Sequence, residues 1–153
     1  MRYRDDKRRR RTRKQATKRL RKIENALMDA QLVSAKNAFI EKFTCCEILY
    51  KSMLADFKKE KGSCVDEKNL KIDMKELPSV IRYAGLSIDK NKVLDPLFSS
   101  SGQYIKRNKK SAKQLRNAIV HKLSVEDMEE VRDRKSDLLE LMNSFIEEVR
   151  NNK

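Results

Sequence analysis

The residues best suited to chemistry lie close together near position 120, where the chain carries its single histidine. Arg116, Asn117 and His121 fall within one short stretch whose composition predicts a helix. Asn117 and His121 are four residues apart and share a helix face, whereas Arg116 lies about 140° around an ideal helix from His121. We therefore expect Arg116 and His121 to meet at one ligand only if the helix loosens at its end, or if two copies meet across a symmetry axis.

These side chains suit the cleavage of RNA by its own 2′-hydroxyl group. A histidine can exchange the proton because its unperturbed pKa is about 6.5. Arg116 could hold the oxygens of the reacting phosphate through paired N–H groups, and Asn117 could orient the imidazole or bind the substrate. No carboxylates with metal-ligand spacing accompany them, so nothing in this pattern requires a metal or another cofactor.

A second interpretation of the same residues involves no chemistry. A histidine in the last turn of a helix interacts favourably with the negative end of the helix dipole. In that case Arg116 is a solvated surface residue. The residues alone leave both interpretations open.

Length and composition favour one all-helical domain. The chain has 153 residues, 39% of them charged, with only three glycines and two prolines. This length is typical of one hydrophobic core, and so few turn-forming residues exclude a β-sandwich or barrel. The net charge is +14, but residues 1–22 hold 13 basic and 2 acidic residues. Most of the excess charge therefore belongs to an N-terminal tail.

The N-terminal tail, residues 1–15, has the composition of an arm that binds phosphates through its cations. Such a run is disordered when alone, although arginine and lysine form helices well once phosphates neutralise them. We predict RNA contacts from this run and from a second basic stretch, namely from Arg8, Arg9, Arg10, Arg11, Arg13, Lys14, Lys109 and Lys110. The alternatives are a localisation or ribosome-targeting signal and an artefact of the start site.

Apolar residues spaced three and four apart predict a helical bundle over residues 16–153. Its four main helices are expected at 16–32, 34–60, 109–122 and 125–151, the first two being either separate or one long bent helix. Ser34 is the expected cap of the second, and Ser124 caps the last after a sharp turn. One or two short helices are expected in the middle. The first is capped by Asp73 and is short, kinked or later in starting because of Pro78, and the second opens at Asp89. The predicted organisation is a tail, 1–15, disordered or helical, followed by an all-α domain, 16–153.

The three cysteines indicate a reducing compartment. Their number is odd and no Cys-x-x-Cys spacing occurs, so a disulfide framework is not expected. Cys45 and Cys46 lie in the apolar stripe of residues 34–60 and are both predicted in or near the core, with Cys64 in a loop. The sequence has no apolar run long enough to span a bilayer, so we expect a cytoplasmic protein without a membrane span.

The run from Arg116 to His121, followed by a long last helix, resembles the HEPN domain (higher eukaryotes and prokaryotes nucleotide-binding). The hallmark of that family is an arginine, a short spacer that usually begins with a polar residue, and a histidine at the end of the penultimate bundle helix. The resemblance extends over roughly residues 16–151 and leaves out the basic tail. It implies a HEPN-like bundle. Many members are metal-independent endoribonucleases that dimerise, which brings two Arg/His sets into one cleft.

The residues and the resemblance together predict a metal-independent endoribonuclease of the toxin or phage-defence kind. Arg116 and His121 are the expected catalytic residues, with Asn117 in support, in a homodimer that needs no cofactor. RNA is the expected partner, and the resemblance adds an antitoxin or a larger defence complex. The alternatives are a non-catalytic dimeric module that binds RNA or nucleotides and a structural adaptor within a larger assembly.

Overall fold

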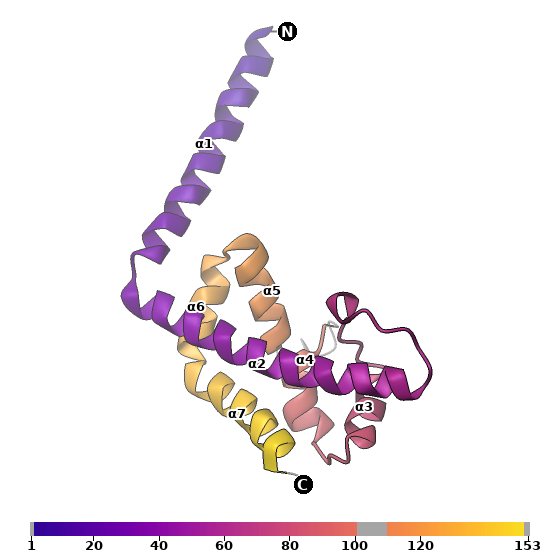
Figure 1. The fold of residues 1–153 in the computed structure, drawn as a ribbon. Helices are drawn as coiled ribbons and strands as arrows, with labels where there is room; N and C mark the ends of the chain where they lie inside the picture. Colours follow the sequence, from indigo (N-terminus) through magenta and orange to yellow (C-terminus); the bar gives the residue numbers. More distant parts are fainter. Residues whose placement is uncertain (1, 101–109, 152–153) are drawn as a thin grey trace.

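The computed structural model describes residues 2–100 and 110–151, and every regular element in these ranges is helical (Figure 1). The helices are α1 (Arg2–Leu27), α2 (Ala30–Glu60), α3 (Leu77–Tyr83), α4 (Asp95–Phe98), α5 (Ala112–Lys122), α6 (Val125–Asp133) and α7 (Lys135–Asn151). Two short elements, the 3-10 helix η1 (Glu67–Asn69) and the π-helix η2 (Lys90–Leu94), lie between α2 and α4. The expected all-α class is confirmed. No helix in the described ranges is long and apolar enough to cross a bilayer.

α2 is the central helix of the body. Its largest buried side chains recur every three or four residues, at Phe39, Phe43, Cys46, Tyr50 and Leu54, because this spacing keeps them on one face. This helix packs against α3, α5, α6 and α7. The apolar stripe predicted for residues 34–60 is therefore the face on which the core is assembled.

An aromatic cluster joins three helices at the centre of the core. The Phe98 ring of α4 lies 5.4 Å from Tyr50 and 6.1 Å from Phe43 on α2, and 5.3 Å from Phe145 on α7, between ring centroids. Phe98 and Phe145 meet edge to face, as ring quadrupoles favour. The buried Tyr50 hydroxyl has no hydrogen-bond partner in the described part of the chain, and burial raises its pKa. Tyr50 therefore contributes to the core through its ring.

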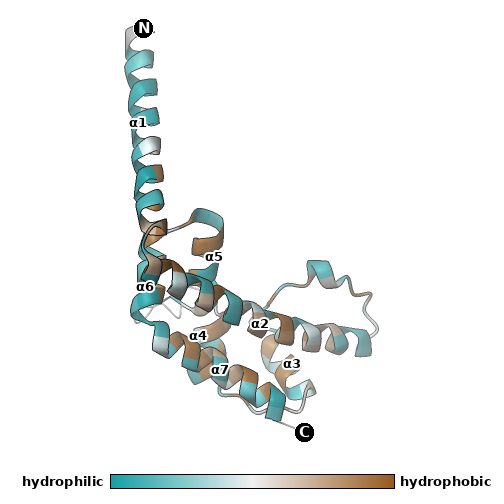
Figure 2. Cartoon of the chain, turned by 60° about the vertical axis from the view of Figure 1, so that its left-hand side comes forward, coloured by the Kyte–Doolittle hydropathy of each residue, from teal (hydrophilic) through white to brown (hydrophobic). Residues whose placement is uncertain are grey.

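α1 extends away from the body, and only its C-terminal end approaches the other helices (Figure 1). There Ala26 is buried, and the Lys22 ammonium lies 4.0 Å from the Glu126 carboxylate of α6. Every side chain from residue 4 to residue 22 is exposed, and Figure 2 shows this length to be almost wholly hydrophilic. We call residues 4–22 the arm. The helix continues unbroken through residues 15 and 16, so the arm extends beyond the predicted tail of residues 1–15.

The break between α1 and α2 lies earlier than predicted. The Asp29 carboxylate accepts hydrogen bonds from the N–H groups of Gln31 (3.1 Å) and Leu32 (3.2 Å), and this cap starts α2 at Ala30. The predicted cap, Ser34, lies within the helix. That prediction was wrong because it overlooked Asp29, whose carboxylate stands directly before the helix and accepts the hydrogen bonds of its first turn.

The C-terminal region differs from the predicted single helix over 125–151. α6 and α7 are separate helices that meet at Arg134, whose backbone leaves the helical conformation. The sharp turn before α6 is confirmed, since Leu123 has a left-handed φ of 47° and the Ser124 hydroxyl accepts a hydrogen bond from the Asp127 N–H. Only the backbone N–H of Asp127 takes part in this cap, because its carboxylate forms an ion pair with the Lys110 ammonium at 2.7 Å.

The short helices in the middle of the chain were predicted in part. Asp89 caps η2, with its carboxylate accepting from the Lys92 N–H at 2.9 Å, and η2 leads directly into α4. α3 begins at Leu77, later than Asp73, as the position of Pro78 indicated, because proline is tolerated in the first turn of a helix. These elements pack residues such as Leu77 and Leu97 into the core beside α2.

The adjacent cysteines of α2 have opposite environments, which corrects the prediction that both lie in or near the core. Cys46 is buried and its thiol donates a hydrogen bond to the Met142 carbonyl at 3.6 Å, whereas Cys45 is exposed. Neighbouring positions on a helix differ by about 100°, and here Cys46 lies on the buried stripe while Cys45 is turned toward solvent. Burial raises the pKa of the Cys46 thiol to about 12. Cys64 is exposed, as predicted.

We predict that a thiol reagent modifies two of the three cysteines in the folded protein. Cys45 and Cys64 should react rapidly, and Cys46 only after denaturation, because the thiolate is the reactive form and Cys46 is both buried and protonated. Titration of the thiols with and without denaturant, followed by mass mapping, tests this. Rapid modification of Cys46 in the native state would contradict the orientation of α2.

Candidate functional site

α5 carries all three residues of the predicted catalytic site and is anchored at both ends. The Ser111 hydroxyl accepts from the Gln114 N–H while the Gln114 side chain accepts from the Ser111 N–H, a capping box that sequence analysis missed. The same hydroxyl donates to the Ser99 carbonyl, which ties α5 to the end of α4. Leu115 and Ile119 are buried. The orientation of the outer face of α5 is therefore fixed by packing.

Arg116 faces α2 and is held by three side chains. Its Nη2 donates to both carboxylate oxygens of Glu47, each at 3.1 Å, and its Nη1 donates to the Asn117 Oδ1 at 2.7 Å. The guanidinium carbon also lies 5.5 Å from the centre of the Phe43 ring. The Arg116 side chain is 23% exposed and that of Glu47 is 17% exposed. Arg116 is thus an ordered, half-buried cation and not a solvated surface residue.

The environment of His121 is opposite to that of Arg116. It is exposed in the last turn of α5, and the described part of the chain offers it no hydrogen-bond or ion-pair partner. α5 stays helical through Lys122, so it does not loosen before His121. A single chain therefore does not bring Arg116 and His121 onto one ligand. Asn117 is half-buried, and its amide binds Arg116.

Sequence analysis missed the partners of Arg116 on α2. Glu47 binds Arg116, and the Lys51 ammonium lies 3.9 Å from the same carboxylate, one helical turn along. The spacing of Glu47 and Lys51 is an i,i+4 pair, which is visible in the sequence. Nothing in the sequence indicates that α5 passes beside this pair. The contact could be found only from the tertiary structure.

Lys113 completes this group of charges. Its Nζ donates to the Ile72 carbonyl at 3.4 Å, and the side chain is half-buried. Burial lowers the pKa of Lys113, and the nearby cations Lys51 and Arg116 lower it further, while the carboxylates of Glu47 and Asp73 act in the opposite direction. We call Glu47, Lys51, Lys113 and Arg116 the junction cluster, because it fills the contact between α2 and α5.

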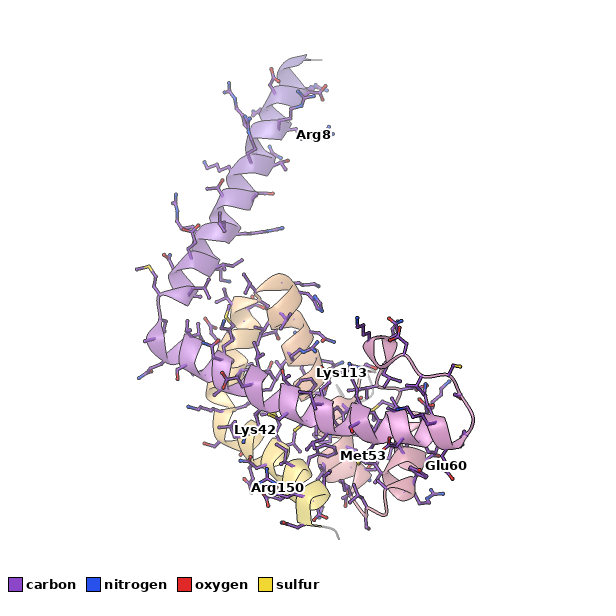
Figure 3. All side chains as sticks on the ribbon, viewed as in Figure 1. Arg8, Lys42, Met53, Glu60, Lys113 and Arg150 are labelled. Atoms are coloured by element: carbon purple, nitrogen blue, oxygen red, sulfur yellow. The ribbon has the colours of Figure 1, made fainter. Side chains whose placement is uncertain are left out.

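The predicted RNA-binding residues fall into three groups. The tail cations are exposed on the arm: Arg8, Arg9, Arg10, Arg11, Arg13 and Lys14. Figure 3 shows Arg8 near the far end of α1, remote from Lys113 at the junction cluster. Lys110 is held in the ion pair with Asp127, and Lys109 lies outside the described residues. The arm and the junction cluster are therefore two separate basic surfaces.

The described residues contain no group of three or more histidine, cysteine, aspartate or glutamate side chains that could hold a metal ion. The charged groups of the site are instead cations around the half-buried carboxylate of Glu47. Such an arrangement suits an anionic ligand. Comparisons of the chain with protein-family models, with curated proteins and with solved structures find no match.

Replacing Glu47 by alanine should destabilise the protein. The change removes the acceptor of two charge-assisted hydrogen bonds and leaves half-buried Arg116 beside Lys51 and Lys113. We expect a loss of about 1–3 kcal/mol in the free energy of unfolding, measured by urea denaturation.

Glu41→Ala is the matched control, because Glu41 is an exposed glutamate on the same helix. Its effect should stay within about 0.5 kcal/mol. In the double variant with Arg116→Ala, the loss should be clearly smaller than the sum of the two single losses. Additive losses would contradict the ion pair.

Proposed function

We propose that this protein is a metal-independent endoribonuclease of the HEPN type, acting in the cytoplasm in a toxin or phage-defence role. The observation that supports this proposal is the contrast between two residues of α5. Arg116 is held in a fixed direction by Glu47 and Asn117, which suits a cation that binds phosphate, and His121 is exposed in the last turn of α5, where a substrate can reach its imidazole.

In the proposed reaction, the His121 imidazole removes the proton of a ribose 2′-hydroxyl. The 2′-oxygen forms a bond to the adjacent phosphorus, the bond from phosphorus to the 5′-oxygen breaks, and the leaving oxygen takes up a proton. The products are a 2′,3′-cyclic phosphate and a free 5′-hydroxyl. Arg116 stabilises the extra negative charge on the phosphorane oxygens, and Asn117 holds the guanidinium in position.

The positions of Arg116 and His121 require a second copy of the chain in this proposal. Arg116 faces α2, whereas His121 faces outward, so one phosphate is contacted by both only if two chains contribute. Val120 and Leu123, which flank His121 in the sequence, are 49% and 39% exposed although apolar. Contact with another chain would cover them. We therefore propose a homodimer with composite sites, restrained by an antitoxin or held within a larger defence complex.

The first test is the cleavage of mixed RNA in the presence of a chelator. Wild-type protein should generate 2′,3′-cyclic phosphate ends. His121→Ala should reduce cleavage to the level of a blank preparation without affecting folding, because the His121 side chain is exposed and forms no hydrogen bond or ion pair in the described chain. Lys122→Ala, at the neighbouring exposed position, is the control and should retain cleavage. Retained cleavage by His121→Ala would sink the ribonuclease proposal.

A mixing experiment tests the composite site. Arg116→Ala and His121→Ala should each be inactive, but their equimolar mixture should recover about one quarter of wild-type activity, because half of the dimers are mixed and each has one intact site. No recovery after subunit exchange would show that the two residues do not act across a dimer interface.

A second candidate function, non-catalytic RNA binding, is favoured by the arm. α1 holds 13 basic and 3 acidic residues, and its side chains are exposed over residues 4–22. Apart from Ala16, residues 4–19 include no apolar side chain, so this length has no apolar face with which to enter a lipid surface. A strand of phosphates can neutralise such a helix on any side.

Replacing the four arginines at positions 8–11 by glutamine should weaken RNA binding and its dependence on salt. For single-stranded RNA, the slope of log K against log salt should become shallower by up to about 3, because four phosphate contacts are lost. The matched control replaces the same four arginines by lysine and should retain the slope. A duplex DNA of equal length distinguishes RNA binding from general polyanion binding. Unchanged slopes in the glutamine variant would exclude the arm as the RNA contact.

A further inference from the structure

The junction cluster carries more positive charge than its contacts within the chain neutralise. Lys51 and Arg116 share the one carboxylate of Glu47, at 3.9 and 3.1 Å, and Lys113 has its amine beside them. The next carboxylate, Asp73, is exposed in the loop before α3. Three cations therefore face two carboxylates, of which only Glu47 is half-buried.

Lys113 is the least satisfied member of the cluster. An ammonium group can donate three hydrogen bonds, and within the described chain Lys113 donates one, a long one of 3.4 Å to the Ile72 carbonyl. An anion placed beside this half-buried ammonium can accept charge-assisted hydrogen bonds from it and offset the positive charge of Lys51 and Arg116. A phosphate group has the charge and the acceptor oxygens for both.

We propose that Lys113, with Lys51 beside it, binds a second phosphate group of the RNA, next to the phosphate held by Arg116. Lys113 precedes Arg116 by three residues, so the two lie one turn apart, about 4.5 Å along the axis of α5. Both face α2, where Glu47 binds Arg116 and lies close to Lys113. The cluster thus places two cations about one helical turn apart on the side of α5 that faces α2. This inference rests on the proposed ribonuclease function for the identity of the ligand.

The experiment uses the full chain and follows backbone amides by NMR during titration with inorganic phosphate. The amides of residues 111–117 should shift in a saturable manner, separately from those of the arm. In Lys113→Gln the affinity for phosphate, obtained from the concentration dependence of these shifts, should fall by about tenfold. This is the effect expected for the loss of one hydrogen bond to a charged group. Lys42→Gln is the matched control, since Lys42 is a half-buried lysine of α2 that lies nine residues from Lys51, about 180° around the helix. Lys42→Gln should bind phosphate with the affinity of the wild-type protein.

A second titration identifies the source of the phosphate. A short RNA with 2′-O-methyl groups, which cannot be cleaved, should shift the same amides and displace inorganic phosphate from them. If this RNA shifts only the amides of the arm, the cluster binds a free anion and not RNA. No saturable response of residues 111–117 to either probe, or an equal response in Lys113→Gln, would overturn the site. Retained cleavage by His121→Ala would overturn the proposed ribonuclease function. It would not change the interpretation of these binding results.

Discussion

α2 buries a continuous stripe of large side chains, and the positions of the other body helices depend on that burial. Phe98 inserts from α4 between Phe43, Tyr50 and Phe145, so α2, α4 and α7 share one aromatic centre. Once this face is buried, the adjacent edge of α2 is fixed as well. Glu47 and Lys51 lie on that edge, and α5 passes beside them. The candidate site is therefore a consequence of the same packing that forms the core.

Positive charge is divided between two surfaces with different physical properties. The arm holds exposed side chains whose attraction to phosphates acts at a distance and is screened by salt. The junction cluster holds half-buried cations in fixed directions, where each hydrogen bond is stronger because less water competes. In the proposed function the arm gathers RNA and the cluster positions one part of the strand. His121 would then act on a strand already oriented.

Periodicity predicted the helices well where apolar residues recur every three or four positions, as in the stripe of α2. It failed at boundaries that depend on a single local contact. Asp29 capped α2 in place of Ser34, and the helix expected over 125–151 broke at Arg134. It also failed for Cys45, because Cys46 lies on the buried side of the helix and Cys45 is turned toward solvent. The start of a helix depends here on a local cap, whereas the direction in which a side chain faces depends on the elements packed against the helix.

The sequence by itself determined the all-helical class, the separation of a basic N-terminal segment from a nearly neutral body, and the placement of Arg116, Asn117 and His121 on one helix. Those features follow from composition and from the spacing of residues along the chain. Only the tertiary structure decided that Arg116 is bound by Glu47 and that Lys113 joins them, because residues 47 and 116 are far apart in sequence. Their contact depends on how α5 packs on α2, and no local pattern specifies that packing.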